Sequence, residues 1–90
     1  MLNQFTKDPQ AKLDYSIDWA DWLAGIDTIS TSTWSVPTGL TGSSASKTAT
    51  LTTIWLAGGT AGQCYEVTNH IVTVSGREDD RSLLILVLQQ

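Results

Sequence analysis

Cysteine is nearly absent from this sequence. Cys64 is the single cysteine among 90 residues, so no disulfide can form within the chain. Small secreted domains usually depend on several disulfides, and their absence favours folding in a reducing cytosol. The segment MLNQFTKDPQ at residues 1–10 also lacks the basic start and apolar stretch of a signal peptide. We therefore expect a soluble protein without an export signal.

Charged residues are scarce too. They make up 16% of the chain, the net charge is -4, and the 5 lysines and arginines are scattered. Nucleic-acid binding needs clustered cations that displace counterions from phosphates, so we expect no nucleic-acid partner. The longest apolar run, LLILVL at residues 83–88, is too short to span a bilayer, and we expect no membrane contact.

Groups that perform catalysis or bind metals are equally few. His70 is the only histidine, and a zinc site would need further His or Cys ligands. Cys64 precedes His70 in the same expected strand by about 20 Å at ~3.3 Å per residue, which excludes a dyad. The acids of GREDDRS at residues 76–82 lack the spacing of a calcium loop and indicate a solvated turn. We expect no enzyme, no metal and no cofactor.

Most of the chain consists instead of residues typical of strands and turns. Apolar and polar residues alternate in KLDYSIDW at residues 12–19, and this period of two predicts a strand with one buried face. ADWLAG at residues 20–25 breaks the alternation and predicts a helical turn closed by Gly25. Pro9 disfavours a helix in residues 1–11, which we expect to form an N-terminal arm.

Further strands are predicted after this corner, separated by polar turns such as GGTAGQ and GREDD. A bulge or bend is expected between Ile29 and Trp34, and a Gly/Ser loop follows at residues 38–47 with a short strand around Leu40. The pattern predicts an all-β, antiparallel β-sandwich that forms a single domain over residues 12–90. The later strands are expected at residues 27–37, 48–57, 64–75 and 81–89.

Strand parity indicates which side chains form the core. Aromatic residues bury large apolar areas, and we expect Trp34 and Trp55 to pack with Trp19 across the two sheets. The expected core comprises Tyr15, Ile17, Trp19, Trp34, Trp55, Tyr65 and Val67.

The last strand does not alternate, because LLILVL is apolar at every position. Either the N-terminal arm covers the outer face of this strand, or another chain does. The second possibility suggests assembly and makes Leu84, Leu86 and Leu88 candidate partner contacts. Trp22, on the corner after the first strand, is a further candidate surface contact.

Four pieces of the sequence, in their order and spacing, resemble a known family. They are DYSIDWADWL, WSVPTGL, WLAGGTAGQCYEVTN and GREDDRS, and the similarity covers roughly residues 7–88. With these pieces the chain resembles the fibre–tail adaptors of tailed bacteriophages, which are small tail proteins with an immunoglobulin-like sandwich.

The resemblance implies a non-catalytic structural protein of the virion tail that connects the tail or baseplate to the tail fibres. It also implies assembly in the bacterial host cytoplasm, other tail proteins as partners, and a homo-oligomer or ring. Two alternatives stay open. One is a carbohydrate-binding β-sandwich module that uses Trp22, and the other is a head–tail junction or capsid protein of the same fold.

Overall fold

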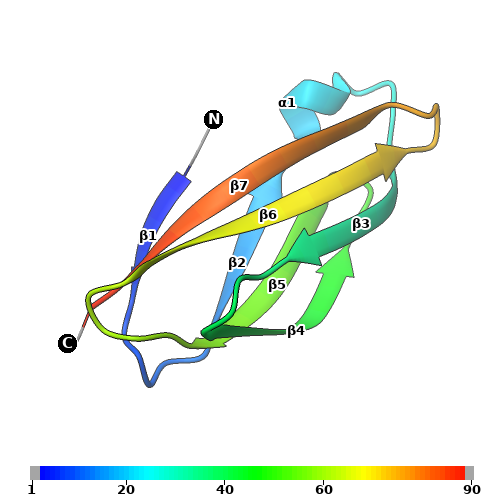
Figure 1. Ribbon diagram of the computed structural model, residues 1–90. Coiled ribbons are helices and arrows are strands. Elements are labelled where there is room, and N and C mark those ends of the chain that lie inside the picture. The colour runs from blue at the N-terminus through cyan, green and yellow to red at the C-terminus, as the bar shows by residue number, and fades with distance from the viewer. Residues whose placement is uncertain (1–2, 89–90) are drawn as a thin grey trace.

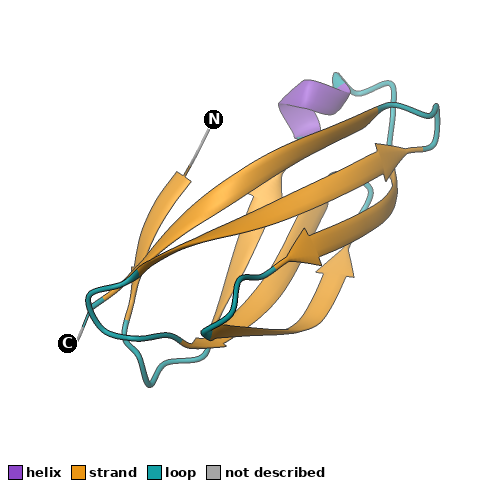
Figure 2. Cartoon of the chain, in the orientation of Figure 1, coloured by secondary structure: helices purple, strands orange, loops and turns teal. Residues whose placement is uncertain are grey.

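The computed structural model describes residues 3–88, which form seven strands and one short helix. The molecule is elongated, at 42 × 23 × 18 Å, and its loops lie mainly at the two ends (Figures 1 and 2). In chain order the elements are β1 (Asn3–Lys7), β2 (Leu13–Asp18), α1 (Ala20–Leu23), β3 (Ile29–Ser35), β4 (Leu40–Lys47), β5 (Leu51–Gly58), β6 (Cys64–Thr73) and β7 (Glu78–Val87).

The strands form two sheets that face each other. One sheet has the order β1-β7-β6-β3 and the other the order β2-β5-β4. All neighbouring strands are antiparallel except β1 and β7. Immunoglobulin domains divide their strands in the same way, with the second, fifth and fourth on one sheet and the third, sixth and seventh on the other. The predicted all-β, immunoglobulin-like sandwich is confirmed.

The N-terminal segment belongs to this sandwich. β1 runs parallel to β7, from Asn3 opposite Leu83 to Lys7 opposite Val87. This corrects the expectation of an arm over residues 1–11, of which residues 1 and 2 lie outside the described part. β7 thereby becomes a central strand, but β1 lies beside it and does not cover its outer face.

A buried lysine explains why β1 could not be found in the sequence. Lys7 is 1% exposed, and its ammonium group donates hydrogen bonds to the carbonyl oxygens of Gly58, at 2.6 Å, and Asp8, at 2.9 Å. Because Gly58 ends β5, the first bond joins the two sheets. Burial lowers the pKa of Lys7, and the negative charge of Asp8 opposes this shift. A strand that points a lysine inward has no apolar alternation to reveal it.

β4 is a full strand rather than a Gly/Ser loop. It pairs with β5 over Leu40–Lys47, with a register shift between Ser43 and Ser46. Its Ser- and Gly-rich composition resembles that of a loop, and only the pairing with β5 reveals the strand.

The structure also tests the bulge predicted in β3 and the turn predicted before β7. The register of β3 shifts between Ile29 and Thr31, inside the interval where the sequence indicated a bulge. The turn before β7 is shorter than predicted, because Glu78, Asp79 and Asp80 already pair with β6.

The hydrophobic core lies between the two sheets. Tyr15, Ile17, Trp19 and Val67 are buried within it. Trp34 and Tyr65 are half-buried and pack against the core from its margins.

Trp55 does not belong to the core, contrary to the prediction. It is 37% exposed, whereas its neighbours Ile54 and Leu56 are 3% and 0% exposed. β5 therefore points Ile54 and Leu56 inward and Trp55 to the outer face of the three-stranded sheet. Both parities of β5 carry large apolar residues, so alternation alone does not decide which face enters the core.

Tyr65 fixes the loop between β5 and β6. Its hydroxyl accepts a hydrogen bond from the backbone N–H of Thr60 at 3.0 Å. Its ring lies against Gly39, where a Cβ would stand 2.9 Å from the ring atom Cε1. A tyrosine at the start of this strand that bonds to the preceding backbone is a recurrent feature of immunoglobulin domains.

A buried hydrogen-bond network joins the sheets at the opposite end. The indole N–H of Trp19 donates to Thr52 Oγ1 at 3.2 Å and to Asn69 Oδ1 at 3.1 Å. Thr52 Oγ1 also donates to Asn69 Oδ1, at 2.8 Å. The amide group of Asn69 donates to Ser32 Oγ and to the carbonyl oxygen of Thr33. Residues at the end of β2 and on β5, β6 and β3 are thus held by one asparagine.

Replacement of this asparagine provides a test. Asn69→Ala is expected to lower the free energy of unfolding by about 2–3 kcal/mol, because the buried donors of Trp19 and Thr52 lose an acceptor. The matched control is Ser16→Ala, which removes the exposed 2.8 Å bond to Thr53 and should change stability by less than about 0.5 kcal/mol. Urea denaturation measures both, and equal effects of the two substitutions would contradict the central role of Asn69.

Candidate functional site

Cys, His, Asp and Glu side chains form no metal site in the described part of the chain. Among residues 3–88, no group of three or more His, Cys, Asp or Glu side chains is placed to hold a metal ion. Cys64 is an exposed free thiol opposite Leu86, whereas His70 lies further along β6, opposite Asp80. The surfaces of the sandwich are therefore the candidate functional sites.

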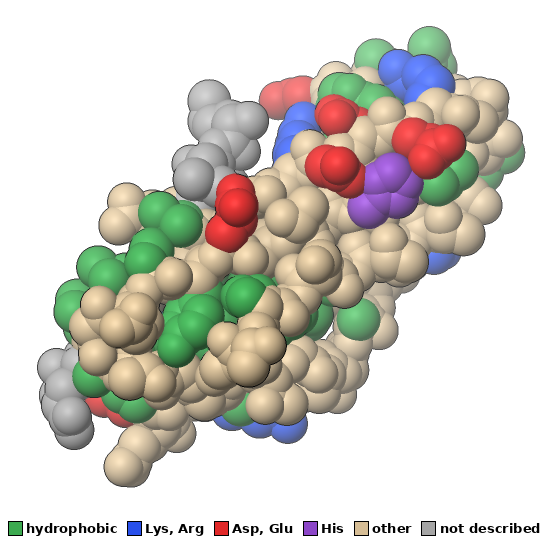
Figure 3. All heavy atoms as spheres, viewed as in Figure 1, with side chains coloured by type: hydrophobic (Ala, Val, Ile, Leu, Met, Phe, Trp, Pro, Cys, Tyr) green, Lys and Arg blue, Asp and Glu red, His purple; other side chains and the backbone are tan. Residues whose placement is uncertain are grey.

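An apolar patch lies on the outer face of the four-stranded sheet. We define it as Leu84, Leu86 and Leu88, together with the neighbouring Cys64 of β6. Leu84 and Leu86 are half-buried and Leu88 is 40% exposed. On the other parity of β7, Leu83, Ile85 and Val87 are buried in the core. Figure 3 shows hydrophobic side chains gathered over the part of this face near the C-terminus.

A charged cluster occupies the opposite end of the same face. His70 Nδ1 lies 2.5 Å from the carboxylate of Asp80, and its Nε2 lies 3.0 Å from that of Glu78. Figure 3 shows the histidine between two acidic side chains. The hydrogen bond with Asp80 and then that with Glu78 raise the pKa of His70. The sequence indicated an outward-facing histidine but placed its acidic partners in a turn.

Trp22 does not present a free ring. The guanidinium of Arg77 stands 4.4 Å from its ring centroid, and Trp19 packs edge-on at 5.7 Å between centroids. Arg77 Nη2 also donates to the carbonyl oxygen of Trp22 at 3.4 Å. A sugar platform needs an exposed ring face, so this packing gives no support to Trp22 as a surface contact.

The same arrangement recurs at Trp19. Arg81 stands 4.4 Å from the Trp19 ring centroid, and its Nη1 donates to the carbonyl oxygen of Asp18 at 3.1 Å. Each cation–π contact contributes about 0.5–2 kcal/mol, depending on its exposure. The two arginines of GREDDRS therefore cover the two tryptophans of DYSIDWADWL, and two of the four characteristic sequence pieces form one contact.

Asp27 holds this end of the molecule together. Its side chain is only 5% exposed and accepts hydrogen bonds from Ser75 Oγ at 2.6 Å and Arg77 Nε at 3.2 Å. The backbone N–H of Thr28 donates to it as well, at 3.0 Å. The Ser75 hydroxyl contributes most to lowering the pKa of Asp27 far below its ordinary range, and Arg77 acts in the same direction.

The lowered pKa predicts a specific acid sensitivity. Because the folded-state pKa lies below the unfolded value of about 3.9, ionised Asp27 stabilises the fold above that pH. This stabilisation is lost as the pH falls from about 4 toward the folded-state pKa. Asp27→Asn is expected to be less stable at pH 7 and to lose less stability between pH 5 and pH 2. Asp21→Asn, on the exposed side of α1, is the control. Denaturation profiles for Asp27→Asn that run parallel to wild type would contradict this.

Trp55 is the exposed aromatic residue that sequence reasoning missed. It lies on the outer face of the three-stranded sheet, between Asp14 of β2 and Ser43 of β4. The available signal was its parity: Ile54 and Leu56 on the other parity are the pair that enters the core.

Fold and surfaces together define a small immunoglobulin-like sandwich that carries an apolar patch on one sheet. Within this class, the chain belongs to a family of phage tail proteins, because residues 7–86 match the family described as podophage GP4 fiber-tail adaptor protein gp77. The resemblance seen in the sequence is thereby confirmed. No curated protein matches the sequence.

Family membership supports a role in the phage tail, with other tail proteins as partners. Within residues 3–88, no helix has the length and apolar character needed to cross a membrane.

Proposed function

We propose that this protein is a rigid, non-catalytic adaptor that connects the tail or baseplate of the virion to its fibres. The family match supports the place in the tail. The observation that carries the docking function is the apolar patch, since three leucines lie on a sheet face that no strand of residues 3–88 covers.

The apolar patch is suited to contact through side chains. β7 pairs with β1 on one edge and with β6 on the other, so its backbone is not free to bind another strand. A partner must therefore lie over the face of the sheet. Complete burial of an exposed leucine contributes about 1.5–3 kcal/mol, and partly exposed leucines contribute less each. The patch thus favours repeated contacts in an assembly over one tight contact.

A second copy of the chain is the partner that we propose for the patch. Closed symmetric assemblies repeat a modest contact around a ring. Such a ring at the tail would provide repeated attachment sites for fibres. The exposed thiol of Cys64 beside Leu86 fits assembly in the host cytoplasm, where thiols stay reduced.

Substitution within the patch tests this assembly. Leu86→Asp is expected to convert an oligomer into a monomer, because it places a charge in the centre of the contact. Trp55→Ser, on the opposite sheet, removes an exposed aromatic side chain and should leave the mass in solution unchanged. Light scattering during gel filtration measures both. A wild-type chain that is strictly monomeric at micromolar concentration would contradict the proposed ring.

Location in the virion is a separate prediction. Antibodies against this protein, imaged by negative-stain microscopy of purified virions, are expected to label the junction between tail and fibres. Label on the head or at the head–tail junction would instead favour the alternative of a head–tail or capsid protein. The proposal fails if intact and disrupted virions carry no label.

A further inference from the structure

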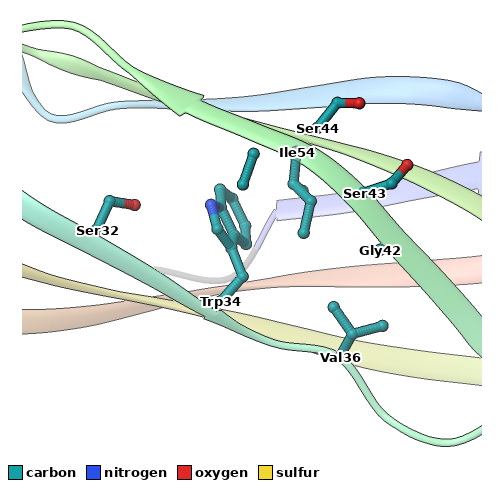
Figure 4. Close-up of a pocket in the computed structure, with 8 residues that line it drawn as sticks. Ser32, Trp34, Val36, Gly42, Ser43, Ser44 and Ile54 are labelled. Atoms are coloured by element: carbon teal, nitrogen blue, oxygen red, sulfur yellow. The ribbon is translucent and has the colours of Figure 1, made fainter.

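A groove opens along one side of the sandwich, between the edge strands β3 and β4. It is a hollow of about 470 Å³, and a smaller one of about 210 Å³ continues it to Lys47. The other side of the sandwich is closed, because the rings of Phe5 and Tyr15 meet there at 5.2 Å. The walls of the larger hollow include Trp34 and Val36 of the β3 side, Gly42, Ser44 and Ala45 of β4, and Ile54 of β5 (Figure 4).

The shape of the groove indicates an extended ligand. The two hollows share Ser32 and Ala45, so together they follow β4 from Gly42 to Lys47. A stretch of that length spans roughly 17–20 Å in a strand. An extended peptide segment of about five residues fits such a length better than a compact small molecule does.

Trp34 supplies a hydrogen-bond donor without a partner. Its Nε1–H is buried, and no acceptor among residues 3–88 lies within hydrogen-bond distance. Figure 4 shows the indole pointing from β3 toward β4, beside Ile54. An unsatisfied buried donor costs about 1–3 kcal/mol. A main-chain carbonyl oxygen of a bound segment would satisfy it.

The strands on the two sides of the groove differ. β4 is irregular here, because its register with β5 shifts between Ser43 and Ser46. Within this shift the backbone of Ser44 has φ 52, a left-handed conformation that costs a non-glycine residue about 1–3 kcal/mol. β3 pairs regularly with β6 from Thr31 to Ser35, and its other edge has no neighbouring strand in the sheet. It also lacks the lysine or proline with which natural proteins protect an edge.

We propose that the groove binds an extended segment of another tail protein, which adds as a strand to the free edge of β3. Its middle is uncharged, because Lys47, at the far end of the smaller hollow, is the only charged residue among residues 3–88 that lines either hollow. One apolar side chain lies over Trp34 and Ile54, and an acidic residue lies near Lys47. The tail as the source of the segment rests on the proposed function.

A carbohydrate fits the groove less well. Sugar rings stack on an exposed aromatic face, whereas Trp34 packs against the hydrophobic core. Within the described part of the chain, the larger hollow is lined by no polar side-chain groups other than the hydroxyl groups of three serines and the indole N–H.

The test uses overlapping synthetic peptides that cover the tail proteins and, as a second set, the head proteins encoded in the same phage genome. Binding to the ¹⁵N-labelled protein is followed by NMR. A tail peptide with an uncharged middle is expected to shift the Trp34 indole N–H signal and to slow amide exchange in β3.

Ala45→Lys, at an exposed position in the groove wall, should weaken binding about tenfold or more, because it puts a charge against the apolar segment. Lys47→Glu should reverse the preference for an acidic residue. Ser16→Lys, at an exposed position of β2 outside both the groove and the apolar patch, is the matched control and should bind the peptide normally.

Each other outcome has a defined meaning. If tail peptides bind only at the apolar patch, the groove proposal is overturned and the tail role stands. If head peptides alone bind in the groove, the groove is still a site for an extended peptide, but the proposed role in the tail fails. Shifts of the Trp34 signal that grow with protein concentration without peptide, or that a glycan produces, would overturn the peptide proposal in favour of self-pairing or sugar binding.

Discussion

The hydrogen bonds of the buried Trp19 indole are the constraint on which the rest of the structure depends. A buried indole N–H is costly to leave unpaired, and for Trp19 the acceptors Asn69 and Thr52 come from two different sheets. This requirement fixes how the sheets face each other at one end of the sandwich. It also fixes the corner after β2, because Trp22 packs edge-on against Trp19. The arginines that cover both rings then determine where the turn between β6 and β7 lies.

At the opposite end of the sandwich, the side chains of a lysine and a tyrosine fix the positions of the strands and loops. Lys7 reaches from β1 to the last carbonyl of β5, and Tyr65 holds the β5–β6 loop through the N–H of Thr60. Both ends are therefore fixed by polar groups that are buried or partly buried, and such groups are costly to leave unpaired. Between the two ends β6 and β7 pair in unbroken register from Cys64 to Val72, whereas β3 and β4 each contain a register shift. A continuously paired sheet centre gives an adaptor a fixed support for its partners.

Sequence patterns predicted the strands that are rich in apolar or β-branched residues, and they missed β1 and most of β4, which are not. The alternation in β2 placed Tyr15, Ile17 and Trp19 on the buried face, where the structure has them. β1 was not predicted because its last residue, Lys7, faces inward. The burial of Lys7 depends on the carbonyl oxygen of Gly58, which lies 51 positions away in the sequence. Trp55 was assigned to the wrong face because both faces of β5 are apolar. The pairing of Arg77 with Trp22 and Asp27 is likewise a tertiary fact that no local pattern contains.

The two proposed surfaces lie far enough apart to be used at the same time. The apolar patch is centred on β7, whereas the groove lies beyond β3, two strand positions away across β6. Two strand spacings amount to about 10 Å, and the patch faces outward from the sheet while the groove opens at its edge. The proposed contact over the patch and the proposed peptide at the edge of β3 therefore use different parts of the four-stranded sheet. If both surfaces competed for one position, the protein could assemble or bind a partner but could not do both. Because the sandwich separates them, the proposed ring and the proposed peptide contact do not require the same residues.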